Sequence, residues 1–211
     1  MPKSLLASDT IRVARFPGDG PGMGEAFQLG DALGGAGPGE VPLSTVSVLN
    51  QGPLRRDLFT FTNMPVPVVS VTTGAGVGGK KFFDFPPGFI KHFSTRGILT
   101  VSVAAAKQAD FTDATPEGDV GVGTAAPADA DALGTDATDD DFGTSTPLTM
   151  SAYSGAVTIP TEAEAVFNGS ATSIDLYVNV FIDAVDIDDS TTTEVLVNGW
   201  LLVCWMNQGD V

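Results

Sequence analysis

Cysteine and histidine are nearly absent from this sequence, which has one of each, Cys204 and His92. A single cysteine excludes an intrachain disulfide framework and a zinc site built from cysteines. A single histidine excludes a multi-histidine metal site within one chain. The fold must therefore be stabilised by its core, by association between subunits, or by cations held through oxygen ligands.

Long apolar runs are also missing, since no stretch approaches the roughly 20 residues needed to cross a bilayer. The first 16 residues mix Lys3, Asp9, Arg12 and Arg15 into short apolar pieces. They lack the continuous apolar segment of a secretory signal. We therefore expect a soluble chain, made in the cytoplasm, with no membrane partner.

Basic residues do not occur after Lys107. The first 107 residues hold all ten bases and seven acids, whereas the remainder holds 19 acids and no Lys or Arg, for a net charge of −16. Such a surface repels phosphate, so the sequence predicts no nucleic-acid partner. Two interpretations remain: a solvated acidic surface, or an N-terminal part that docks while the acidic part faces solvent.

The residues that are abundant favour β structure. The chain has 25 glycines and 14 prolines, which penalise helix interiors but suit turns and strand ends. Apolar alternation begins near residue 56 and no segment has convincing helical periodicity. We predict an all-β fold, an antiparallel sandwich or jelly-roll-like barrel over residues 51–211. It has a polar insertion at about 107–150, read as a long acidic loop with one short strand at 120–124.

Three strand predictions are specific. Residues 174–185 and 195–205 alternate at period two and are separated by an acidic turn, which predicts an antiparallel hairpin. Residues 89–93 and 98–103 read as two short strands. The apolar stretch from Leu201 to Trp205 should lie centrally in the sheet or against another subunit.

The segment 1–50 reads as an extended arm. Dense Gly and Pro clusters at 17–22 and 30–39 interrupt any periodicity. Its short apolar pieces could each add as a strand to a neighbour. As interface candidates we take apolar and basic residues of the arm and the strands: Ile11, Arg12, Val13, Arg15, Phe16, Arg55, Arg56, Trp200 and Trp205.

Catalytic motifs are weak. Gly74 to Lys80 has the spacing of a phosphate-binding loop, but Lys81 stands where a hydroxyl is needed, and the following residues cannot begin a helix. His92 has no motif around it, and Cys204 has no neighbouring cation in the sequence. The sequence therefore predicts a protein that is not an enzyme.

Calcium is the one cofactor that the acid-rich loops suggest, because it takes hard oxygen ligands. No EF-hand pattern is present, so we expect no cofactor, with calcium as a weak alternative. The candidate ligands are Asp136, Asp139, Asp140 and Asp141 in one cluster and Asp186, Asp188 and Asp189, with Asp183, in another.

Several segments resemble a small structural protein of tailed-bacteriophage virions. They are Gly52–Asp57, Lys81–Gly88 and Gly118–Ala125, with a closing strand that ends Trp205–Asp210. The resemblance covers about residues 50–210. It implies a capsid decoration or cement protein on the virion surface, bound to the major capsid protein and to copies of itself, as a homotrimer. A head-fibre or receptor- or glycan-binding β module is the alternative.

Overall fold

The structure, a computed structural model, describes residues 45–51, 54–72, 75–112, 114–127, 133, 138, 140–160, 164–183, 187 and 192–209. The predicted arm, residues 1–50, therefore lies outside the described residues, apart from its last six. The fold is all-β and antiparallel, as predicted. Its elements are β1 Thr45–Gln51, β2 Leu54–Thr72, β3 Ala75–Asp84, β4 Gly88–Ser102, the 3-10 helix η2 Ala105–Asp110, β5 Glu117–Gly123, β6 Gly143–Thr149, β7 Ser154–Ile159, β8 Ala165–Gly169, β9 Asp175–Ile182 and β10 Thr192–Asn207.

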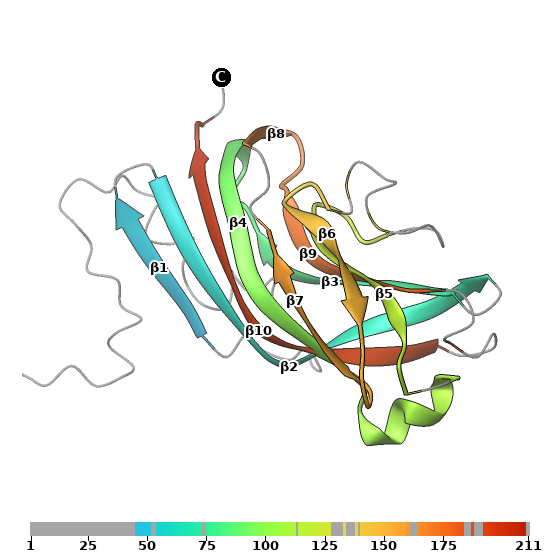
Figure 1. Cartoon of the computed structure of the whole chain (residues 1–211). Coiled ribbons are helices and arrows are strands. Elements are labelled where there is room, and N and C mark those ends of the chain that lie inside the picture. Colours follow the sequence, from blue (N-terminus) through green and yellow to red (C-terminus); the bar gives the residue numbers. More distant parts are fainter. Residues whose placement is uncertain are drawn as a thin grey trace, which may run out of the picture.

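The strands form one sheet that curls into a nearly closed barrel (Figure 1). Eight of them follow the order β6-β5-β9-β3-β2-β10-β4-β7, while β1 pairs with β2 and β8 pairs with β4. The two ends of this path, β6 and β7, lie against each other. There the hydroxyl of Thr146 donates to the carbonyl oxygen of Thr158, at 3.3 Å. A closed path leaves few open edges on the sheet.

Two of the strand predictions are wrong. β9 and β10 do not form a hairpin, because β3 and β2 lie between them: β9 pairs with β3 and β5, and β10 pairs with β2 and β4. The connection between them spans about three strand spacings of 4.8 Å, which nine residues reach easily. The predicted strands 89–93 and 98–103 are one strand, β4, with Gly97 inside it.

Gly97 continues β4 because the neighbouring strand is close. A Cβ atom at this position would lie 2.1 Å from the carbonyl oxygen of Trp200. The same reason explains why the glycine-rich residues 75–80 form part of β3. A Cβ atom on Gly78 would lie 1.7 Å from the carbonyl oxygen of Pro67. Glycine here permits a close approach of two backbones.

The predicted polar insertion contributes to the barrel. β5 and β6 lie within residues 107–150 and pair with each other, and β5 also pairs with β9. β5 includes residues 120–123 of the short strand predicted at 120–124, with Val120 and Val122 fully buried. The acid-rich remainder, from 128 to 139, lies outside the described residues except for Leu133 and Thr138.

Aromatic side chains fill the barrel. Phe83 contacts Phe59, Phe85 and Trp205, with ring centroids 5.0 to 6.2 Å apart. Phe142 extends this cluster, 5.4 Å from Phe85. These five residues are at most 2% exposed. Buried rings of this size supply much of the hydrophobic free energy of a β fold.

Bulges decide which residues of the long strands face the core. In β2 the inward residues are odd-numbered up to Phe61 and even-numbered from Met64. The change occurs at Asn63, whose φ of 50° is left-handed and whose N–H donates to the Asn198 side chain. In β4 the change occurs at Phe93, between inward His92 and Thr95. Each bulge reverses the inward parity of the residues that follow.

Candidate interaction surface

The central strand β10 separates the interface candidates of the strands into two groups. Trp205 is fully buried and Arg55, its neighbour in register on β2, is 3% exposed, so both point into the barrel. Trp200 is 37% exposed and Arg56 is also exposed, so both point outward. Residues an odd number of positions apart on a strand face opposite sides of the sheet. The inward pair belongs to the core, and the outward pair stands on the surface.

The inward residues form a polar cluster across three strands. Arg55, Trp205 and His92 are partners in register on β2, β10 and β4. Asp57 and Thr95 occupy the next inward row, on either side of Val203. The indole N–H of Trp205 donates to Oδ2 of Asp57 at 2.6 Å, and the guanidinium of Arg55 lies 5.1 Å from the Trp205 ring centroid. A charge-assisted bond and a cation–π contact thus meet at one tryptophan.

Burial controls the ionisation of this cluster. The pKa of Asp57 is raised from 3.8 to about 6, because desolvation outweighs the opposing effects of the Trp205 hydrogen bond and the Arg55 charge. His92 is fully buried, with Nε2 3.0 Å from the Thr95 hydroxyl and its ring centroid 4.4 Å from that of Phe142. Enclosed groups of this kind fix side chains and strand register in the core.

The outward side chains of the same strands form what we call the Trp200 face. Register places Leu58, Leu202 and Arg96 in one row across β2, β10 and β4. The next row contains Thr60, Trp200 and Ile98. The Trp200 face consists of Arg56, Leu58, Lys91, Phe93, Arg96, Ile98, Val166, Trp200, Leu202, Cys204 and Met206.

Large apolar side chains are unusually exposed on the Trp200 face. Ile98 is 47% exposed beside Trp200, and Val166, which pairs with Lys91 from β8, is 57% exposed. Val69, at the far end of β2, is the fourth large hydrophobic residue of the described chain that is exposed. Three of the four thus lie on three adjacent strands. Trp200 and Ile98 are neighbours in register, whereas Val166 lies seven positions farther along β4, at Lys91. Adjacent exposed apolar residues such as Trp200 and Ile98 indicate an interaction site more strongly than scattered ones do.

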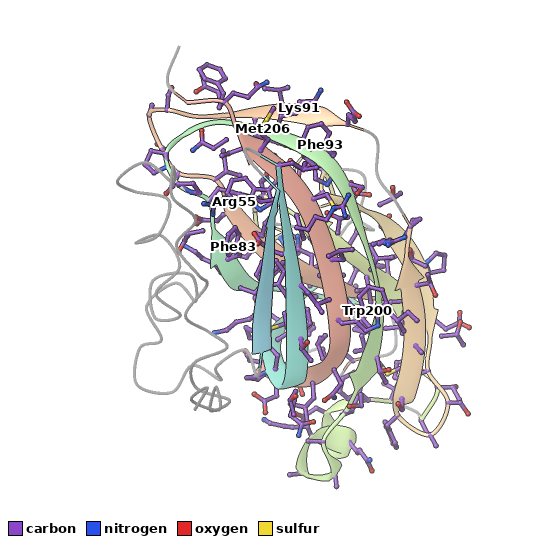
Figure 2. All side chains as sticks on the ribbon, turned by 90° about the vertical axis from the view of Figure 1, so that its left-hand side faces the viewer. Arg55, Phe83, Lys91, Phe93, Trp200 and Met206 are labelled. Atoms are coloured by element: carbon purple, nitrogen blue, oxygen red, sulfur yellow. The ribbon has the colours of Figure 1, made fainter. Side chains whose placement is uncertain are left out.

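The charge of the Trp200 face is opposite to that of the whole chain. Arg56, Lys91 and Arg96 are its charged side chains. Lys91 forms an ion pair with Glu164 at 3.1 Å, and its Nζ lies 4.8 Å from the ring centroid of Phe93. In Figure 2, which looks onto this side of the barrel, Lys91, Phe93 and Met206 lie together near one end of β10 and β4, with Trp200 farther along.

The sequence analysis missed most of this surface. It selected Arg56 and Trp200 but not Arg96, Ile98 or Val166. The alternation of β10 alone could have separated Trp200 from Trp205, because they are five residues apart. The pairing of Trp200 with Ile98 depends on the strand order and the register, which the sequence does not specify.

Acidic side chains lie on the other wall of the barrel, on what we call the Asp119 face. It consists of Glu117 and Asp119 on β5 and Asp183 after β9. The backbone N–H of Asp183 donates to the carbonyl oxygen of Glu117, at 2.9 Å. The pKa of Asp119 is raised, first by desolvation and second by the negative charge of Asp183. In the eight-strand path, β5 stands four places from β10, on the opposite side of the barrel (Figure 1).

The calcium candidates are only partly covered by the structure. Asp136, Asp139, Asp186, Asp188 and Asp189 lie outside the described residues. The two oxygens of Asp141 accept hydrogen bonds from the N–H and the hydroxyl of Thr124, each at 2.8 Å, and Oδ2 of Asp140 accepts from the N–H of Ser145 at 3.0 Å. Within the described part of the chain, no three His, Cys, Asp or Glu residues form a group that could hold a metal ion.

The arm candidates Ile11, Arg12, Val13, Arg15 and Phe16 also lie outside the described residues. No helix in the described ranges is both long and apolar enough to span a membrane.

Comparison of the sequence with known proteins gives no assignment: no family model matches the chain, and no curated protein is significantly similar to it. The Trp200 face and the Asp119 face are therefore interpreted from their own chemistry.

Proposed function

We propose that this chain is a structural virion protein that decorates and stabilises a phage capsid, by binding the major capsid protein and copies of itself. The observation that carries the proposal is the Trp200 face. An exposed tryptophan, isoleucine and valine stand beside three bases on a chain whose net charge is −16. Trp and Arg are the residue types most enriched among the energetically dominant residues of protein interfaces.

The resemblance to tailed-phage structural proteins gives the proposal its setting. Two of its segments form parts of the barrel wall: Lys81–Asp84 ends β3, and Gly118–Gly123 lies in β5. A barrel with an aromatic core and closed hydrogen-bond ladders is a rigid support for a binding surface. Rigidity suits a protein that must hold capsid subunits together under the pressure of packaged DNA.

The glycan-binding alternative has less support. It relied on calcium held by the acidic loops. Of the three candidate carboxylates that the structure describes, Asp140 and Asp141 accept hydrogen bonds from Ser145 and Thr124, and Asp183 belongs to the Asp119 face. Those bonds stabilise the turn between β5 and β6. We therefore give the decoration role precedence.

The test is to purify the virus particle whose genome encodes this chain, and to measure its protein composition. We expect the chain at a fixed ratio to the major capsid protein. Particles produced without the chain should release their DNA at a lower temperature than complete particles. Adding purified chain to them should raise the temperature of DNA release to that of complete particles. Two results would contradict the proposal: native particles that do not contain the chain, or particles produced without the chain that release their DNA at the same temperature as complete ones.

A further inference from the structure

We propose that the partner of the Trp200 face is the Asp119 face of a second copy, so that copies associate front to back. This deepens the proposed function and rests on it for its biological setting, since it names which surfaces join neighbouring copies. The contact itself requires only this chain. It involves the outer surfaces of β2, β4 and β10 on one copy and of β5 and the end of β9 on the other.

Charge complementarity is the first argument. The outward side chains of β2 and β4 within 54–70 and 88–102 include Arg56, Lys91 and Arg96 and no acid. On β10 the one outward acid is Glu194, six positions from Trp200. The Asp119 face carries Glu117 and Asp119 on β5 and Asp183 directly after β9, and neither strand contains Lys or Arg. Opposite potentials bring two such surfaces together in one orientation.

The second argument concerns the carboxylates. The backbone N–H of Asp183 donates to the carbonyl oxygen of Glu117 at 2.9 Å, so Asp183 lies beside the start of β5. The pKa of Asp119 is raised, first by desolvation and second by the negative charge of Asp183. A guanidinium from a neighbouring copy, such as that of Arg96, would relieve this repulsion and donate hydrogen bonds to both carboxylates. The apolar residues beside Arg96, Trp200 and Ile98, would lose their exposure to water in the same contact.

A symmetric face-to-face dimer fits the charges less well. Two copies joined through their Trp200 faces would place Arg56, Lys91 and Arg96 of one copy near the same residues of the other. Like charges in a desolvated interface oppose association. Because the two faces stand on opposite walls, each copy instead offers one of each, and contacts continue from copy to copy as a row or a closed ring.

The test uses sedimentation velocity of the full-length chain and three designed proteins. The front variant is Trp200→Ser with Arg96→Glu, and the back variant is Glu117→Lys with Asp119→Lys. The control variant is Val69→Ser with Lys107→Glu, which changes one exposed apolar residue and one base outside both faces. Near-ultraviolet circular dichroism and a thermal melt confirm that each variant is folded.

We expect the wild-type chain and the control to associate as concentration rises, and less so at high salt. The front variant and the back variant should each associate about tenfold more weakly or worse. Mixed together they should form one-to-one dimers and nothing larger, because the mixture contains one intact face of each kind. A back variant that associates like the wild type, or a wild-type chain that stays monomeric at all concentrations, overturns the proposal.

Two further results distinguish other occupants of the Trp200 face. If deletion of residues 1–44 makes a monomeric chain associate, the arm covers the face, and the front-to-back contact is wrong. If the front variant associates normally but no longer binds capsids, the face docks on the capsid protein, which again overturns this contact while supporting the proposed function. Association that follows the predicted pattern, in a chain that does not bind capsids, supports the contact and contradicts the decoration role.

Discussion

The two tryptophans of β10 lie on opposite sides of the barrel wall, one inside the barrel and one on its outer surface. Trp205 is fully buried, donates to Asp57 and packs on Phe83 and Phe85, whereas Trp200 is 37% exposed beside Ile98. They are five residues apart on one strand. The same residue type is therefore part of the core at one position and exposed on the outer surface at the other, because residues an odd number of positions apart on a strand face opposite sides.

Replacing Trp205 by alanine should produce the largest effect on the inner side. Removal of a fully buried aromatic side chain leaves a cavity and an unpaired Asp57, and should lower the free energy of unfolding by about 3–5 kcal/mol. Urea denaturation followed by circular dichroism measures this. If Trp205→Ala were no more destabilising than Trp200→Ala, the claim that only Trp205 belongs to the core would be wrong.

The pH dependence of stability should depend on Asp57. Its pKa is raised to about 6 by burial, so the folded chain binds this proton more tightly than the unfolded chain does. The contribution is fully present below a pH of about 4 and is lost as the pH rises through about 6. A rise of this size in the pKa corresponds to a change of about 3 kcal/mol in the free energy of unfolding across this pH range.

Asp57→Asn cannot ionise and should remove this dependence. Urea denaturation of both proteins across that pH range gives the difference, and the comparison separates Asp57 from Asp141, whose pKa burial also raises to about 6. Parallel pH profiles for the wild type and Asp57→Asn would show that Asp57 does not carry the effect.

The bulge at Asn63 should have an intermediate effect, because it sets which side of β2 is inward. Its φ of 50° suits asparagine or glycine and strains a β-branched residue. Asn63→Val should cost about 1–2 kcal/mol and Asn63→Gly a few tenths, both measured by denaturation. Equal stability of the two variants would mean that the bulge tolerates a right-handed backbone.

Trp200→Ala should have the smallest effect on folding. An exposed side chain away from the core changes the free energy of unfolding by about 0.5 kcal/mol or less. The fluorescence spectrum of the Trp200→Ala variant should retain the blue-shifted emission of the buried Trp205. A loss of stability close to that of Trp205→Ala would place Trp200 in the structural core instead of on the binding surface.

The sequence predicted the fold class because alternation at period two is local and strong, as in residues 174–182 and 201–205. It failed on the strand order, because nothing near β9 or β10 indicates that β3 and β2 lie between them. It also failed where a bulge interrupts alternation: Phe82 and Phe83 are both buried, since the register of β3 shifts between Lys81 and Phe83. Such shifts depend on the partner strand.

The candidate surface was predicted in part for the same reason. Arg56 and Trp200 were selected by residue type, but so were Arg55 and Trp205, which point inward. Parity separates Arg55 from Arg56, whereas the grouping of Trp200 with Ile98 and Arg96 requires the pairing of β10 with β4.

The accessibility of Trp200 to a soluble quencher tests the central claim most directly. Subtracting the acrylamide quenching of a Trp200→Phe variant isolates the signal of Trp200 from that of Trp205. We predict that Trp200 is readily quenched in dilute protein, and shielded both in concentrated protein and on assembled capsids. Equal quenching in the dilute and the assembled states would contradict the claim that the Trp200 face is the interaction surface of this protein.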